Sequence, residues 1–596
     1  MTLGIRIAIR RLVATTLILA SCMAVAADPS KVLHLATNDI DTLDPQQWQD
    51  QSSADIGSAI FESLYEWDYL ARPPGIVPDT AVAAPEISAD GRTWTIRIKP
   101  GIYFTGDPAF HGEPRELVAA DYVYSIERSL DPNLRGGGSA VTTDLVVGMR
   151  AVVDAARKRG AKFNYDTPVE GLRALDRYTL RFRLNQPNFP LMENILTGIY
   201  GAYAVAREVV DAAGGDIQAR AVGTGPYRLK DWKRGSRIVL EANPAYRAIA
   251  FPATSDPARA ALEREMQGER LPQVGRIEFS VIEEMQARLL EFERGKLDIV
   301  ELRGVDAQRL LKNGELDPML AARGIRRQVD PHGTAAVYFN MEDPVVGGMS
   351  RQQIALRRAI ALGLDAGGLS KVVYAGQARP ANQILPPGVS GFDPMRSSKP
   401  RYDPGTANSL LDRFGYDRRG KDGLRLAPDG KPLVLTVSLV NSAESREMQT
   451  LWKKNMAAVG VRMEFRSLPA QDLFKEAAQG KFQLTMHGRG TSPTGLVLTE
   501  LYGKEPPDRN DARFRSDAYD RALEQYLRAA TETERLAAAR TMDDIVDGFV
   551  PLIPMVLVFD NTFVQSWVMG YQHSPFATYY QYIDIAPGKQ HLASGR

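Results

Sequence analysis

The sequence predicts an α/β protein of two or three domains. The chain has 596 residues, which is enough for several separate hydrophobic cores. Residues 433–440 form a near-continuous apolar run, a helical pattern follows at 445–460, and residues 461–468 alternate in polarity. Strand, helix and strand in such close succession predict a βαβ unit with two parallel strands.

Residues 222–247 predict a β-hairpin. Gly223 and Gly225 stand one residue apart, as in a turn that holds phosphate, but such a turn must run directly into a helix. Here Pro226 follows, and two alternating runs are separated by the turn sequence "KRGS". No Gly-Lys pair in the chain is followed by Ser or Thr, so the sequence also predicts no P-loop.

Other elements follow from hydrophobic spacing. We expect a strand around 32–35, a helix over 52–67 capped by Ser52 or Ser53, and a half-buried strand at 94–98. A second helix is expected over 118–131, with Asp121 near its start. Residues 550–564 are too rich in proline and β-branched residues for a helix, which predicts a strand that crosses between domains.

The first 27 residues predict an export signal. Three arginines precede an apolar run at 12–20 that is too short to span a bilayer, and small residues follow it. Cys22, the only cysteine, ends "LASC", which resembles a lipobox and so leaves a lipid anchor at Cys22 as an alternative. The apolar residues after it favour ordinary cleavage near Ala27 and a periplasmic protein.

Charge and motif content exclude several classes of function. Lys plus Arg is 73 and Asp plus Glu is 72, so the protein lacks the excess positive charge that favours binding to nucleic acid. The six histidines form no pair at metal-ligand spacing, and no nucleophile motif of a serine hydrolase is present. We therefore expect no catalytic residues, no metal and no cofactor, which favours a carrier or receptor over an enzyme.

Seven motifs occur in an order that resembles the family 5 extracellular solute-binding proteins, which include bacterial dipeptide- and oligopeptide-binding proteins. They are "DTLDPQ", "AIFESLYEW", "DGRTWTIRIKPGIYF", "VAADYVYSIERSLDP", "VGTGPYRLKDWKRGSRIVLEANPAYR", "RRAIALGLDAGGLSKVVYAGQARPANQILPPG" and "VPLIPMVLVF". The resemblance covers nearly the whole chain after the signal.

The resemblance implies a periplasmic-binding-protein-like α/β fold, with two lobes, a hinge and an additional small domain on the first lobe. The expected division is a signal peptide (1–27), first lobe (28–65), small domain (66–189), first lobe again (190–320), second lobe (321–551), and first lobe with the C-terminal tail (552–596).

The implied function is capture of peptides or peptide-like solutes for an ABC transporter. A monomeric protein would close on its ligand and dock on membrane permease subunits with their ATPases, without nucleic acid. Three alternatives stay open: a carrier for a non-peptide anionic solute, a sensory or chaperone-like receptor, and a periplasmic enzyme on the same fold.

The resemblance also places the ligand site. Peptide-binding relatives carry a tryptophan and an aspartate on a loop of the second lobe, and the aspartate holds the peptide's free amine. The matching residues 483–498 contain neither a tryptophan nor an acidic residue. From this loop and from the first loop of the chain, we expect the substrate-binding residues to be Asp39, Ile40, His487, Gly488, Arg489, Gly490 and Thr491. Arg489 would attract an anion, and Asp39 would receive a cationic group.

Overall fold

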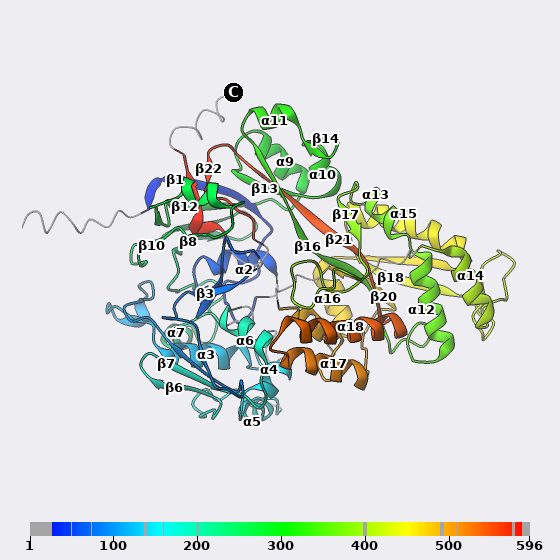
Figure 1. The fold of residues 1–596 in the computed structure, drawn as a ribbon, viewed down its shortest axis with the longest axis horizontal. Coiled ribbons are helices and arrows are strands. Elements are labelled where there is room, and N and C mark those ends of the chain that lie inside the picture. Colours follow the sequence, from blue (N-terminus) through cyan, green and yellow to red (C-terminus); the bar gives the residue numbers. More distant parts are fainter. Residues whose placement is uncertain are drawn as a thin grey trace, which may run out of the picture.

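The computed structural model describes residues 27–586 except 49, 73, 136–139, 159, 199–201, 397–401, 489–493, 508 and 575–577. The expected signal, with Cys22, lies outside the described residues. Three larger sheets organise the described chain (Figure 1).

The first sheet has four strands in the order β1-β12-β9-β8. They are β1 (Asp28–Thr37), β12 (Val274–Val281), β9 (Arg237–Ala242) and β8 (Tyr227–Lys233). Strand β1 is parallel to β12, while β8 and β9 pair antiparallel. The strand predicted around 32–35 and the hairpin predicted over 222–247 are therefore confirmed.

The two glycines of the hairpin motif serve close packing of main chain on main chain. A Cβ atom at Gly223 would lie 2.0 Å from the Ile60 carbonyl oxygen, and one at Gly225 would lie 2.7 Å from the same atom. The N–H of Gly225 donates to that oxygen at 2.8 Å. Only glycine permits this approach.

The same contact corrects the helix predicted over 52–67. Helix α2 (Gln51–Ser58) ends early, and strand β2 (Tyr65–Trp67) follows. The carbonyl groups of Ala59 and Ile60 leave the helix to accept from Tyr227 and Gly225. The N-cap is Asp50, whose side chain accepts from the Ser53 N–H, and neither predicted serine holds that position.

The second sheet belongs to the region expected as the small domain. Its strands are β4 (Glu86–Ile87), β5 (Thr93–Arg97), β7 (Thr179–Arg183) and β6 (Leu172–Asp176), all antiparallel. Helix α3 (Ala119–Ser129) contacts β6 and β7. The predictions of a strand at 94–98 and a helix over 118–131 are confirmed.

The third sheet runs β13-β21-β16-β20-β18-β19, with β17 beside β21. Its strands are β13 (Ile299–Leu302), β21 (Leu552–Val564), β16 (Arg326–Phe339), β20 (Leu484–Gly488), β18 (Val434–Val440), β19 (Arg462–Leu468) and β17 (Ala378–Pro380). Strands β16 and β21 pair antiparallel along their lengths and run diagonally from β13 toward β18 and β20 (Figure 1). The crossing strand predicted at 550–564 is therefore present.

The predicted βαβ unit is also confirmed. Strands β18 and β19 pair in parallel, and helix α15 (Ala443–Ala458) connects them. Trp452 of this helix is fully buried.

Further elements complete the described chain. The remaining α-helices are α4 (Ala140–Leu145), α5 (Met149–Ala156), α6 (Phe189–Leu196), α7 (Arg207–Ala212), α8 (Ala260–Glu265), α9 (Met285–Glu293), α10 (Gly304–Gln308), α11 (Pro318–Ala322), α12 (Arg351–Gly363), α13 (Ala366–Val372), α14 (Pro404–Arg413), α16 (Ala470–Ala478), α17 (Asp517–Arg528) and α18 (Glu532–Phe549). Short strands are β3 (Ile76–Pro78), β10 (Ile249–Ala250), β11 (Arg270–Leu271), β14 (Leu311–Lys312), β15 (Glu315–Leu316), β22 (Val568–Met569) and β23 (Asp584–Ile585). The 3₁₀ turns are η1 (Pro108–Phe110), η2 (Leu496–Leu501) and η3 (Tyr580–Tyr582).

The expected domain boundaries stay predictions. Two of them, at 320/321 and 551/552, fall close to where the long strands β16 and β21 begin. Across the described part of the chain, no helix combines the length and apolar character needed to cross a bilayer.

Candidate functional site

The structure places the first predicted site residues on a loop beside α2. Asp39 is exposed, and its carboxylate accepts from the N–H groups of Ile40 and Gly235, both at 3.1 Å. Ile40 is buried, with 2 % of its surface exposed. Asp39 therefore supports the β8–β9 turn, and the Ile40 side chain belongs to the core.

The second group of predicted residues lies at the end of β20. The His487 ring stacks on Tyr338, with centroids 4.5 Å apart and planes at 11°, and its Nε2 atom lies 3.5 Å from Asp511 Oδ2. The Phe474 ring meets His487 edge-on at 5.7 Å. Gly488 is exposed and pairs with Ala335 of β16. Arg489, Gly490 and Thr491 lie outside the described residues.

A small cavity of about 10 Å³ lies next to Tyr338. It has room for about one water molecule. Its lining is mainly apolar and comes from both long strands, one loop and η2: Thr334, Ala336, Tyr338, Ile384, Val497, Leu552 and Pro554. On the other side, the Tyr338 hydroxyl donates to Glu500 Oε2 at 3.0 Å. The part of this lining that falls in the expected second lobe is aromatic and apolar, and we call it the second-lobe wall: Thr334, Ala336, Tyr338, Ile384, His487 and Val497.

Charged residues line the edge where β13 joins the long strands. Arg303 pairs with Glu301 at 2.9 Å and with Asp560 through its Nε atom. Burial lowers the pKa of Arg303, but the two carboxylates outweigh burial and the net pKa is raised. Glu301 stands opposite Thr562 in the ladder, and its side chain is 40 % exposed.

A second carboxylate approaches this edge from α2. Burial raises the pKa of Asp55 to about 7, and repulsion from Glu301 and Asp50 raises it as well. A hydrogen bond from Gln51 acts in the opposite direction and lowers the pKa. The Asp55 residue is half-buried, so water still reaches it.

Aromatic rings of the C-terminal segment stand beside these carboxylates. The ring centroids of Tyr571 and Tyr579 lie 5.0 Å apart, and those of Tyr579 and Tyr580 lie 4.9 Å apart. Burial raises the pKa of both Tyr579 and Tyr580, and the charges of Asp55 and Glu301 add to it. We call Asp55, Glu301, Tyr579 and Tyr580 the first-lobe wall.

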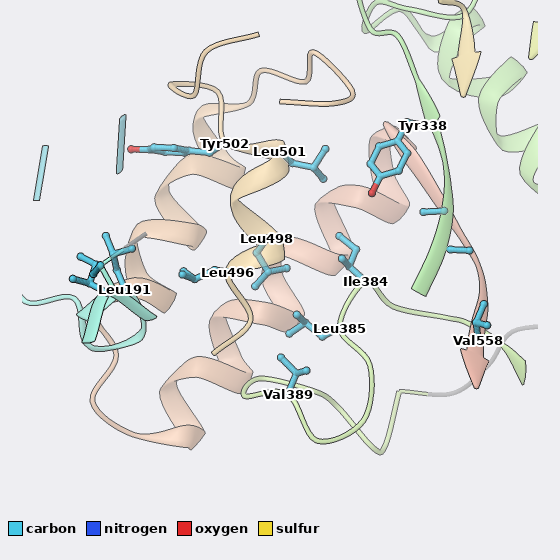
Figure 2. Packing of buried hydrophobic residues seen from close by; sticks show 14 of the residues in the cluster. Leu191, Tyr338, Ile384, Leu385, Val389, Leu496, Leu498, Leu501, Tyr502 and Val558 are labelled. Atoms are coloured by element: carbon cyan, nitrogen blue, oxygen red, sulfur yellow. The ribbon is translucent and has the colours of Figure 1, made fainter. Parts of the chain in front are cut away.

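Contacts also join α4 and α6 to the segments on either side of η2. The Asn194 side chain donates to the Thr494 hydroxyl, and the Val141 N–H donates to Glu505 Oε1 at 3.3 Å. Figure 2 shows Leu191 of α6 in the buried hydrophobic cluster that includes Leu496 of η2. These contacts connect the regions expected as small domain and first lobe to the region expected as second lobe.

No group of three or more His, Cys, Asp or Glu side chains suited to a metal ion occurs within the described ranges. The walls offer hydrogen bonds, charges and ring faces, which suit reversible binding.

Sequence reasoning missed Asp55, Glu301 and the two tyrosines. They come from positions hundreds of residues apart, and each alone reads as an ordinary helix, strand or tail residue. No sequence motif joins them, because their proximity arises only when α2, β13 and the C-terminal segment pack together.

Comparison with known proteins identifies the class. The model of "Bacterial extracellular solute-binding proteins, family 5 Middle" matches residues 75–499, and the chain belongs to this family. A di/tripeptide-binding protein from Pseudomonas aeruginosa is 23 % identical, over 87 % of this chain and 90 % of that protein. The glutathione-binding protein GsiB of Shigella boydii is 22 % identical, over 91 % of each chain.

Solved structures agree on the two-lobed fold. The oligopeptide-binding protein AppA of Bacillus subtilis, in complex with a nonapeptide, superposes with a TM-score of 0.73 at 14 % identity, covering 94 % of this chain and 100 % of AppA. The Escherichia coli murein tripeptide binding protein MppA gives a TM-score of 0.71 at 21 % identity, covering 94 % and 99 %. The unliganded open form of MppA gives 0.60 at 21 % identity, covering 94 % and 98 %.

Proposed function

We propose that this protein is the substrate-binding component of an ABC importer, which captures peptides or peptide-like solutes and delivers them to a membrane permease. Membership of the solute-binding family carries this proposal. Relatives named for peptide binding and matched along nearly their whole length support the peptide class.

Closure of the lobes is the proposed mechanism. The overlap is larger with the AppA–peptide complex than with the unliganded open form of MppA. The bonds from Asn194 to Thr494 and from Val141 to Glu505 are contacts of the kind that a closed form makes. The paired strands β16 and β21 are the proposed hinge, with lobe boundaries near 320 and 551.

The same proposal covers the remaining properties of the protein. The protein acts by binding and performs no covalent step. It works in the periplasm after export, and it is a monomer that binds no nucleic acid. The solute would contact Asp39 and Ile40, Ile40 through its main chain, and residues 487–491 on the opposite lobe.

A non-peptide or blocked anionic solute is the second candidate. Residues 483–498 offer His487 and Arg489, and no acidic residue, to a ligand amine. A planar guanidinium suits a carboxylate or phosphate.

A thermal-shift screen followed by small-angle scattering tests the function. The screen compares di- and tripeptides, amine-blocked peptides, sugar acids and opines, because a ligand bound only by the folded state raises the melting temperature. The hit should reduce the radius of gyration. A ligand confirmed by calorimetry that leaves the radius unchanged would contradict closure, and steady turnover of the ligand would favour an enzyme.

Localisation has its own test. Cys22→Ser should leave release of the protein into the soluble periplasmic fraction unchanged. If the wild-type protein fractionates with membranes and the variant does not, the lipid anchor at Cys22 is correct.

A further inference from the structure

We propose that Phe474 of α16 is a specificity-determining residue of the second lobe, whose ring packs on an apolar or aromatic side chain of the captured solute. The inference rests on the proposed function, because it names the kind of solute group that the second lobe recognises. Phe474 is not among the site residues expected from the sequence, but its ring contacts one of them, His487.

Three rings follow one another from the interior of the second lobe to its surface. Tyr338 is 3 % exposed and stacks on His487, which is 8 % exposed. The Phe474 ring meets His487 edge-on, with centroids 5.7 Å apart and planes at 64°, and Phe474 is 47 % exposed. Because Tyr338 and His487 are nearly covered, Phe474 is the member of this series that offers ring surface to a solute.

The exposure of Phe474 sets it apart from the other large aromatic side chains. Among the phenylalanine and tryptophan residues that the structure describes, it alone is exposed. Its neighbour Leu473 is buried, and α16 contacts strand β18 of the sheet. A solute group that covers the ring would remove apolar surface from water, which favours binding of an apolar group at this position.

Helix α16 is fixed beside His487 by one short segment. Arg513 is buried and donates through Nη2 to the last two carbonyl oxygens of α16, at 2.8 and 2.7 Å. Asp511, two residues earlier, lies 3.5 Å from His487 Nε2. The same segment therefore holds both the end of the helix and the ring that Phe474 contacts, so the exposed ring is positioned before a solute arrives.

The position of α16 suits a solute held between the lobes. In the view of Figure 1, α16 lies between α2 of the first lobe and α12 of the second. The cavity beside Tyr338 has a volume of about 10 Å³, which is room for one water molecule and too little for a side chain. An apolar solute group is therefore expected to lie on the surface that Phe474 presents, outside the second-lobe wall.

Calorimetry with matched tripeptides tests this preference in the wild-type protein. Phenylalanine is placed at each position of Ala-Ala-Ala in turn, and every peptide is measured with a free and with an acetylated amino terminus. At one position or more, the phenylalanine peptide should bind at least about tenfold more tightly than its alanine counterpart, as burial of an aromatic side chain requires. Lysine at the same position should give no such gain.

Variants then assign the preference to Phe474. Phe474→Ala should reduce the advantage of the phenylalanine peptide to less than about threefold and leave the affinity for the alanine peptide unchanged. Phe474→Tyr keeps the ring and should retain the advantage. Val372→Ala, on α13, is the matched control, because Val372 is also an apolar side chain with 47 % exposure, and it should change neither affinity.

Three results would overturn the inference while solute capture itself stands. The first is a protein that binds a solute from the screen but binds no phenylalanine peptide more tightly than its alanine counterpart. The second is a preference for phenylalanine that persists in Phe474→Ala. The third is a gain for lysine peptides that Phe474→Ala abolishes, since the ring would then recognise a cation. If no solute binds at all, the proposed function fails together with this inference.

Discussion

The two walls differ in chemistry and in how they are built. The first-lobe wall gathers carboxylates and tyrosine rings, and burial raises the pKa of its half-buried Asp55 to about 7. The second-lobe wall has Tyr338 stacked on His487 beside a largely apolar cavity, and the Tyr338 hydroxyl donates to Glu500. The first wall therefore gathers negative charge, whereas the second presents mainly ring faces and apolar surface.

The largest expected effect comes from the main-chain contact that supports the first-lobe wall. Gly223→Ala places a methyl group 2.0 Å from the Ile60 carbonyl oxygen, and backbone must move. We expect a loss of about 3 kcal/mol in the free energy of unfolding and a lower melting temperature. Gly106→Ala is the control, because nothing lies within 4 Å of that Cβ position. Equal stability of the two variants would show that α2 does not depend on this contact.

Arg489 tests the second-lobe side. Arg489→Ala should weaken binding of the native anionic ligand by about ten- to a hundredfold, as expected for a charge-assisted contact worth about 1.5–3 kcal/mol. Arg489→Asp should improve affinity for free-amine peptides. Calorimetry measures these affinities. If the wild type binds simple dipeptides tightly and Arg489→Ala binds them with the same affinity, the expected contrast between the two walls is wrong.

Tyr338→Phe should have a smaller effect. It removes a hydrogen bond of 3.0 Å to Glu500 in a largely buried setting, which is worth about 1 kcal/mol of stability. The ring stack on His487 should persist. Chemical denaturation measures the difference, with Tyr103→Phe at an exposed position as the control. A stability loss no greater than that of the control would show that the bond contributes little.

A separate prediction concerns the pH dependence of stability. Asp55 has its pKa raised from 3.8 to about 7 on folding, so the unfolded chain releases this proton first. The free energy of unfolding should therefore fall as pH rises from about 4 to about 7. Asp55→Asn should flatten this part of the curve relative to the wild type. Parallel wild-type and variant curves would contradict the raised pKa.

Local patterns were sufficient for much of the fold. The alternation at β5, the hairpin of β8 and β9, and the β18–α15–β19 unit follow from hydrophobic periodicity within short windows. The sequence motifs also identified the family correctly.

Helix α2 shows where local patterns fail. Its apolar spacing continues to Leu64, yet the helix stops at Ser58, because the carbonyls of Ala59 and Ile60 bond to residues far along the chain. A long-range main-chain contact overrides periodicity there.

By itself, the sequence determined the strands, the hairpin, the parallel unit and the solute-binding class, because these depend on neighbouring residues or on motifs read in order. Only the tertiary structure decided that Asp39 supports a turn, that Ile40 is buried, and that Asp55 and Glu301 act on each other. Binding walls are assembled from segments distant in sequence, and a carboxylate's role depends on the partners that packing brings to it.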